Sequence, residues 1–60
     1  MTTSQMHALF DLKYVSEQLS ELPPAHPYMP GLFRRHDGIV KQLHRSGMTN
    51  DDIDTALDSL

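Results

Sequence analysis

The sequence predicts an all-α fold, a small helical bundle in which an antiparallel helix hairpin is followed by a short third helix. Three observations lead to this prediction. Two segments repeat apolar residues at alternating spacings of three and four, a proline-rich stretch separates them, and a glycine followed by a threonine marks the start of a third helix. No segment alternates apolar and polar residues as a strand does. We therefore expect one helical domain over residues 1–60.

The first helix is expected over residues 3–22. Thr2 and Gln5 have the spacing of a capping box at its start. Pro23 ends the helix, because α geometry is disfavoured for the residue before a proline. The inward stripe of this helix recurs every three or four residues and consists of Ala8, Leu12, Val15, Leu19 and Leu22.

The first helix carries a second apolar stripe as well. Met6, Phe10 and Tyr14 step by four residues along the nearly opposite face, about 160° from the centre of the inward stripe. A chain of this length buries only about 60% of the surface that its unfolded form exposes, and without Cys it has no disulfide to stabilise it. We therefore expect this second stripe to form the interface of a homodimer or to bind another protein.

All four prolines lie within residues 23–30, and we expect a stiff, extended connector over residues 23–29. A second helix is expected over residues 30–46, with Pro30 in its first turn. Its inward stripe consists of Met29, Phe33, His36, Val40 and Leu43, widened by Leu32 and Ile39. Gly38 leaves an alternative open, in which the helix is split and Asp37 caps a shorter one.

The segment after the second helix carries the most specific local pattern. Gly47 has the position of a left-handed residue that ends a helix, and Met48 follows it where it can contact Leu43, as in a Schellman ending. Thr49 and Asp52 have the spacing of a capping box for a third helix over residues 50–60. The inward residues of this helix are expected to be Ile53, Ala56, Leu57 and Leu60, and the outward ones Asp51, Asp54 and Asp58.

The net charge of −3 is unevenly distributed along the chain. Residues 1–25 carry −2, residues 26–48 carry +3 and residues 49–60 carry −4. The basic residues of the middle segment are candidate contacts for nucleic acid or for an acidic protein surface, and they are Arg34, Arg35, Lys41 and Arg45. Because an aspartate-rich helix follows directly, we expect most of this basic charge to pair with the aspartates, within the chain or between subunits.

Residues 39–57, IVKQLHRSGMTNDDIDTAL, resemble part of the helix-turn-helix regulators in the family of quorum-sensing and response-regulator output domains. The resemblance covers 19 of the 60 residues and is carried by Gly47, Met48, Thr49, Asn50 and Ile53. It implies a helix-turn-helix corner and a dimeric DNA-binding transcriptional regulator. Four aspartates in the third helix have the wrong charge for a phosphate backbone. DNA binding is therefore the alternative hypothesis.

The sequence favours a role without catalysis. It has no Cys nucleophile, no glycine-rich phosphate loop and no carboxylate pair beside an apolar pocket, so we expect neither an enzyme nor a cofactor. The spacing of His7, His26, His36 and His44 puts no two of them on adjacent helical turns, so no metal site is expected. No apolar run has the length of a membrane span, and the lack of Cys fits the cytoplasm. We predict a small regulatory or inhibitory module that docks a helix face on a larger protein.

Overall fold

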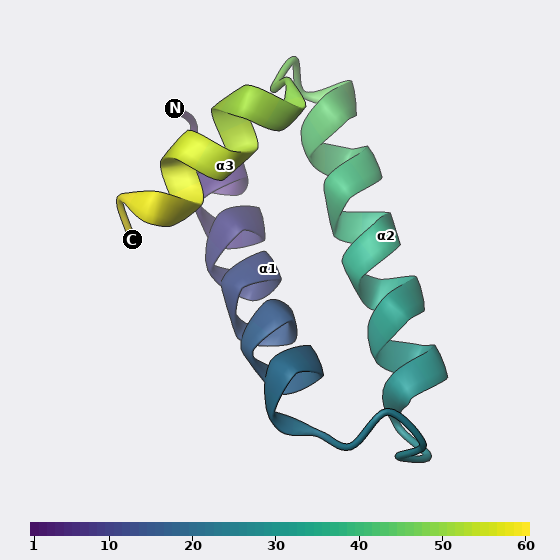
Figure 1. Cartoon of the computed structure of the whole chain (residues 1–60). Coiled ribbons are helices and arrows are strands. Elements are labelled where there is room, and N and C mark those ends of the chain that lie inside the picture. Colours follow the sequence, from purple (N-terminus) through teal and green to yellow (C-terminus); the bar gives the residue numbers. More distant parts are fainter.

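The structure is a computed structural model that describes residues 1–60. It contains three α-helices and no strand: α1 (Thr3–Glu21), α2 (Met29–Arg45) and α3 (Asn50–Asp58). As Figure 1 shows, α1 and α2 run antiparallel, and α3 leads back from the end of α2 across the N-terminal half of α1. The prediction of an all-α fold, with a helix hairpin and a short third helix, is confirmed.

One apolar core lies where the three helices meet. Its buried side chains come from all three of them and are Ala8, Leu9, Leu12, Val15, Ile39, Leu43 and Ile53. Leu9 is fully buried although it lies outside the predicted stripe, because α3 packs on α1 beside α2 and widens the face that α1 buries. None of the helices has both the length and the apolar character that crossing a bilayer requires.

The buried face of α2 differs from the predicted one. Ile39 and Leu43 are buried and Leu32 is partly buried, whereas the side chain of Phe33 is 60% exposed. The predicted stripe, with Leu32 and Ile39 widening it, is thus buried or partly buried except at Phe33, because the direction from which α1 approaches decides which of its residues are covered. The prediction that Phe33 belongs to the core was wrong.

The capping boxes predicted at two helix starts are confirmed. The hydroxyl of Thr2 accepts from the amide of Gln5 (3.1 Å), and the Gln5 side chain accepts from the amide of Thr2 (2.9 Å). Thr49 and Asp52 make the same reciprocal pair at the start of α3, at 3.1 and 3.0 Å. Each pair satisfies amides that a helix leaves without an internal acceptor.

The end of α2 is the predicted Schellman ending. Gly47 has a φ of +100°, and the amide of Met48 donates to the carbonyl of Leu43 (3.1 Å). α2 itself is continuous through Gly38, so the split-helix alternative was wrong. Asp37 does not cap a shorter helix but pairs with Lys41 one turn later on α2.

The connector between α1 and α2 is folded into two turns rather than extended. The amide of His26 donates to the carbonyl of Pro23 (2.9 Å), and the amide of Met29 donates to the carbonyl of His26 (3.0 Å). Pro24 and Pro27 each occupy the second position of one turn, where the φ fixed by the proline ring is favourable. The prolines therefore reverse the chain tightly, and the prediction of an extended connector was wrong.

Candidate protein-interaction surface

The outer face of α1, defined here by Met6, Phe10 and Tyr14, remains exposed in the folded chain. These side chains are 43%, 52% and 56% exposed and follow one another one turn apart along the helix. The opposite face of the same helix provides the fully buried residues Leu12 and Val15. α1 is thus apolar on two sides, and the chain itself covers only one of them.

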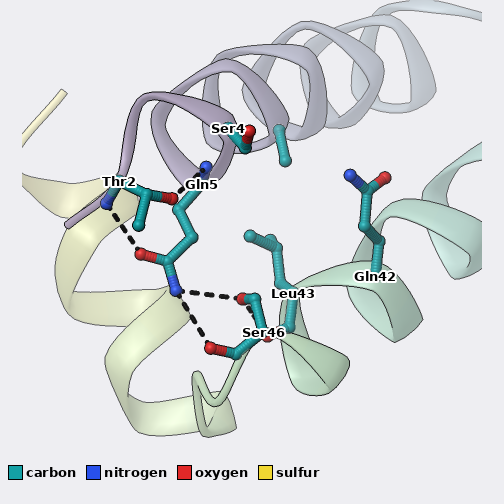
Figure 2. A pocket seen from close by; sticks show the side chains of 7 residues that line it. Thr2, Ser4, Gln5, Gln42, Leu43 and Ser46 are labelled. Atoms are coloured by element: carbon teal, nitrogen blue, oxygen red, sulfur yellow. Dashed lines mark hydrogen bonds between the residues drawn. The ribbon is translucent and has the colours of Figure 1, made fainter.

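The N-terminal end of this face is held in place by Gln5. Its Nε2 donates to the backbone oxygen of Ser46 (3.3 Å) and to the Ser46 hydroxyl (3.0 Å). Figure 2 shows that the same Gln5 side chain takes part in the capping box with Thr2, so one residue fixes the start of α1 and ties it to the end of α2. The face therefore sits on a helix anchored at its first turn.

Apolar surface continues from both ends of the outer face. Met6 borders a hollow of about 450 Å³, the methionine hollow, whose other apolar lining residues are Met1, Met48, Ala56 and Leu60. Tyr14 borders a groove of about 550 Å³, the tyrosine groove, whose other large apolar lining residues are Leu22, Tyr28 and Leu32. Only Phe10 borders neither. The apolar surface thus extends from α1 onto α3 at one end and onto the start of α2 at the other.

The exposed charges of α1 next to the outer face are negative, whereas Arg35 of α2, which pairs with Asp11, lines the tyrosine groove. Glu17 and Glu21 are exposed beyond Tyr14, and α1 has no basic residue in its last turn. Lys13, the only basic residue of α1, is turned toward α3, where its Nζ donates to the backbone oxygen of Leu60 (2.7 Å). A partner that covers this face therefore meets apolar side chains in the middle and carboxylates toward the C-terminal end of α1.

Three of the four basic residues of α2, Arg34, Lys41 and Arg45, share an exposed face of the helix at spacings of seven and four, and Arg35 lies apart from them. Arg35 turns toward α1 and donates to the carboxylate of Asp11. Lys41 pairs with Asp37 on its own helix at 2.9 Å. Arg34 and Arg45 are exposed and have no carboxylate partner. Of the four residues predicted to contact nucleic acid or an acidic protein surface, Arg34 and Arg45 thus form no salt bridge within the chain.

The predicted pairing of this basic charge with the aspartates of α3 is absent within the chain. No salt bridge joins α2 to α3. The reason is the direction of α3, which leaves the Gly47 turn across α1 and not along the outer side of α2 (Figure 1). The two helices instead share a polar link between side chains, in which His44 Nε2 lies 2.7 Å from Asn50 Oδ1.

Asp52 is an aspartate of α3 with a defined local role. The hydrogen bond that its carboxylate accepts from the Thr49 backbone lowers the pKa of Asp52, and its bond with the Thr49 side chain lowers it further. The ionised form accepts these bonds, and it also lies at the positive end of the helix dipole. Asp52 is therefore part of the fold and not a free acidic contact.

No three His, Asp or Glu side chains come together in a metal-binding arrangement. His36 lines a hollow between α2 and α3 together with Val40, Leu57 and Asp54. No buried polar side-chain atom lacks a hydrogen-bond partner.

Sequence reasoning missed two exposed aromatic side chains, Tyr28 and Phe33. Tyr28 lies at the N-cap of α2, where its ring is 4.9 Å from that of His26 and its amide donates to His26 Nδ1 (3.1 Å). The available signal was Pro27, because proline favours the second position of a turn and the segments that connect helices run over the surface. No feature of the sequence indicates that Phe33 is exposed, since its spacing fits a core position.

No protein-family model matches the chain, and no similar curated protein or solved structure is found. The resemblance of residues 39–57 to helix-turn-helix regulators stays an expectation from the sequence.

Proposed function

We propose that this chain is a small, non-catalytic protein-interaction module that regulates or inhibits a larger protein by docking the outer face of α1 on it. One observation carries the proposal. Met6, Phe10 and Tyr14 are large apolar side chains exposed on a helix whose other side forms the core. An apolar patch that continues into neighbouring hollows is characteristic of a binding surface.

The side chains of this face suit an interface. Aromatic side chains each bury about 150–250 Å² and are frequent among the residues that dominate binding energy. They come from the middle of a helix, so their positions are fixed before binding. With Glu17 and Glu21 beside them, the matching surface on the larger protein is an apolar groove with a basic rim.

The test compares capture of partners by the wild-type chain, Phe10→Glu and Phe33→Glu. Both substitutions place a carboxylate at an exposed aromatic position, but only the first lies on the outer face of α1. We expect Phe10→Glu to lose a protein that wild type and Phe33→Glu retain after nuclease treatment. Equal retention by all three chains would refute docking through this face.

The second candidate is a dimeric DNA-binding regulator, favoured by Arg34 and Arg45, which are exposed and unpaired on α2. Titration of duplex DNA tests it, because binding through phosphate contacts weakens steeply as salt rises. Salt-sensitive binding that Arg34→Ala combined with Arg45→Ala abolishes would favour DNA over a protein partner. The acidic first turn of α3, with Asp51 and Asp52, is the reason we rank it second.

A further inference from the structure

We infer that, in the absence of a larger partner, a second copy of the chain covers the outer face of α1, with the two α1 helices antiparallel and Phe10 at the centre. The inference rests on the proposed function because it names an occupant of the same surface. Docking on another protein then requires the pair to separate, which makes self-association a control on docking.

The apolar residues fit this arrangement because Phe10 lies midway between Met6 and Tyr14. In an antiparallel pair centred on Phe10, the two Phe10 side chains are level, and Met6 of each copy is level with Tyr14 of the other. Rows one turn apart are separated by about 6 Å along the helix, so every apolar row meets an apolar row. Side chains spaced by four form one of the two kinds of ridge through which nearly antiparallel helices pack.

The charges of α1 select the antiparallel direction. α1 has no acidic residue in its first turn and no basic residue in its last, while Glu17 and Glu21 lie toward its C-terminal end. That distribution opposes the helix dipole, whose C-terminal end is negative. An antiparallel pair brings Glu17 level with Thr3 of the second copy, where the first-turn amides have no acceptor within the helix. A parallel pair would instead place each of these glutamates beside its counterpart.

The apolar surface next to the outer face increases the area that a second copy can bury. A stable interface buries about 800 Å² of each partner, which is more than three half-exposed side chains supply. The methionine hollow and the tyrosine groove extend the apolar surface at both ends of the face. α2 packs on the other side of α1, and α3 lies beside the outer face only at its Met6 end, where it lines the methionine hollow, so the half-exposed Phe10 at the centre stays accessible to a second copy.

Sedimentation equilibrium of the purified full chain is the first test. We expect a dimer at micromolar concentration, a monomer for Phe10→Glu and a dimer for the control Phe33→Glu. Circular dichroism checks that each variant is helical. A wild-type chain that stays monomeric over this range overturns the inference, while the capture experiment can still support docking on a larger protein, so the two proposals fail separately.

The direction of the helices is tested with single thiols, since the chain has no cysteine of its own. Met6→Cys and Tyr14→Cys chains, one of them enlarged by a tag, are mixed and oxidised. We expect the mixed disulfide to form in preference to either symmetric one. Preferential formation of the two symmetric disulfides would show a parallel pair and overturn the inference, and this readout does not depend on the folding of Phe10→Glu.

Glu17→Gln gives a second test of direction, through the sign of its effect. In the antiparallel pair this change removes two equivalent carboxylate contacts with helix N-termini, and we expect the dimer dissociation constant to rise about threefold or more. In a parallel pair the same change relieves repulsion between like charges and tightens the dimer. Tighter association of Glu17→Gln would therefore contradict the antiparallel arrangement.

Discussion

Gly47 determines where α3 goes. Its φ of +100° lies in the left-handed region, and the turn that it makes directs the chain from the end of α2 back across α1. Thr49 then starts the new helix two residues later through its capping box with Asp52. Both effects are local and depend on residue type, which is why the sequence alone predicts them.

The first prediction compares Gly47 with Gly38. A Cβ added at either position has no atom within 4 Å, so the two sites differ only in backbone conformation. We expect Gly47→Ala to lower the free energy of unfolding by roughly 1–2 kcal/mol, the cost of a left-handed residue with a side chain. Gly38→Ala should raise it by about 0.5–1 kcal/mol, because it lies inside α2.

Chemical denaturation followed by circular dichroism measures both changes. Equal effects at Gly47 and Gly38 would show that the positive φ at Gly47 carries no energetic cost and that α3 does not depend on this turn.

The second prediction concerns the acid sensitivity conferred by Asp52, whose pKa is lowered by its hydrogen bonds with Thr49. A group with a pKa lower in the folded state than in the unfolded state stabilises the fold above its unfolded value, and this contribution is lost as the pH falls through the folded value. We therefore expect the thermal unfolding midpoint of the wild type to decrease as the pH is lowered below about 4. The thermal midpoint of Asp52→Asn should decrease less over the same pH interval.

Asp51→Asn is the matched control, because it removes a carboxylate from the same helical turn and leaves both cap hydrogen bonds in place. It should retain the acid sensitivity of the wild type. An Asp52→Asn chain as acid-sensitive as the wild type would contradict a role for the ionised cap.

At the scale of helices, the sequence predicts where a helix begins and ends better than which of its faces is buried. The capping residues act on their own backbone, whereas the buried side of α2 is chosen by the helices that pack on it. Phe33 and Leu32 both satisfy the helical period, and only the approach of α1 leaves Phe33 outside. Leu9 is buried for the same kind of reason, since α3 covers a side of α1 that the main stripe does not include.

The third prediction separates the arginines of α2. Arg35 contacts Asp11 of α1, but both side chains are substantially exposed, so the pair adds at most about 1 kcal/mol to stability. Arg34 has no carboxylate partner, and Arg34→Ala should change the free energy of unfolding by less than about 0.5 kcal/mol. Arg35→Ala should cost more than Arg34→Ala.

Urea unfolding of the two variants decides this prediction. A larger loss for Arg34→Ala than for Arg35→Ala would mean that the exposed arginine finds an acidic partner in solution, for example on α3 of a second copy.

At the scale of the whole molecule, the prediction that the basic residues pair with the aspartates within the chain was wrong, and pairing between subunits stays a prediction. Segment charges of +3 and −4 on successive helices suggest pairing, yet the direction set by the Gly47 turn keeps the two charged faces apart. The candidate surface fared differently, because Met6, Phe10 and Tyr14 are indeed exposed in the folded chain. Their periodicity shows that they share a face of the helix. The pattern within one chain does not indicate which molecule covers that face.

The fourth prediction links the fold to self-association. A chain of this size with few buried residues has a small free energy of unfolding. A second copy that binds only the folded form raises the stability of the fold by mass action. We expect the thermal midpoint of the wild type to rise with protein concentration across the micromolar range. Phe10→Glu should melt at a midpoint that does not depend on concentration, because its carboxylate would be buried without a partner charge at the centre of the pair.

Phe33→Glu is the control, since it changes an equally exposed aromatic residue outside the outer face of α1 and should keep the concentration dependence. Calorimetric melts of the three chains over a hundredfold dilution measure the effect. A wild-type midpoint that stays constant through this dilution would mean that the folded monomer is stable alone, and that the outer face of α1 is left free for a larger protein at every concentration.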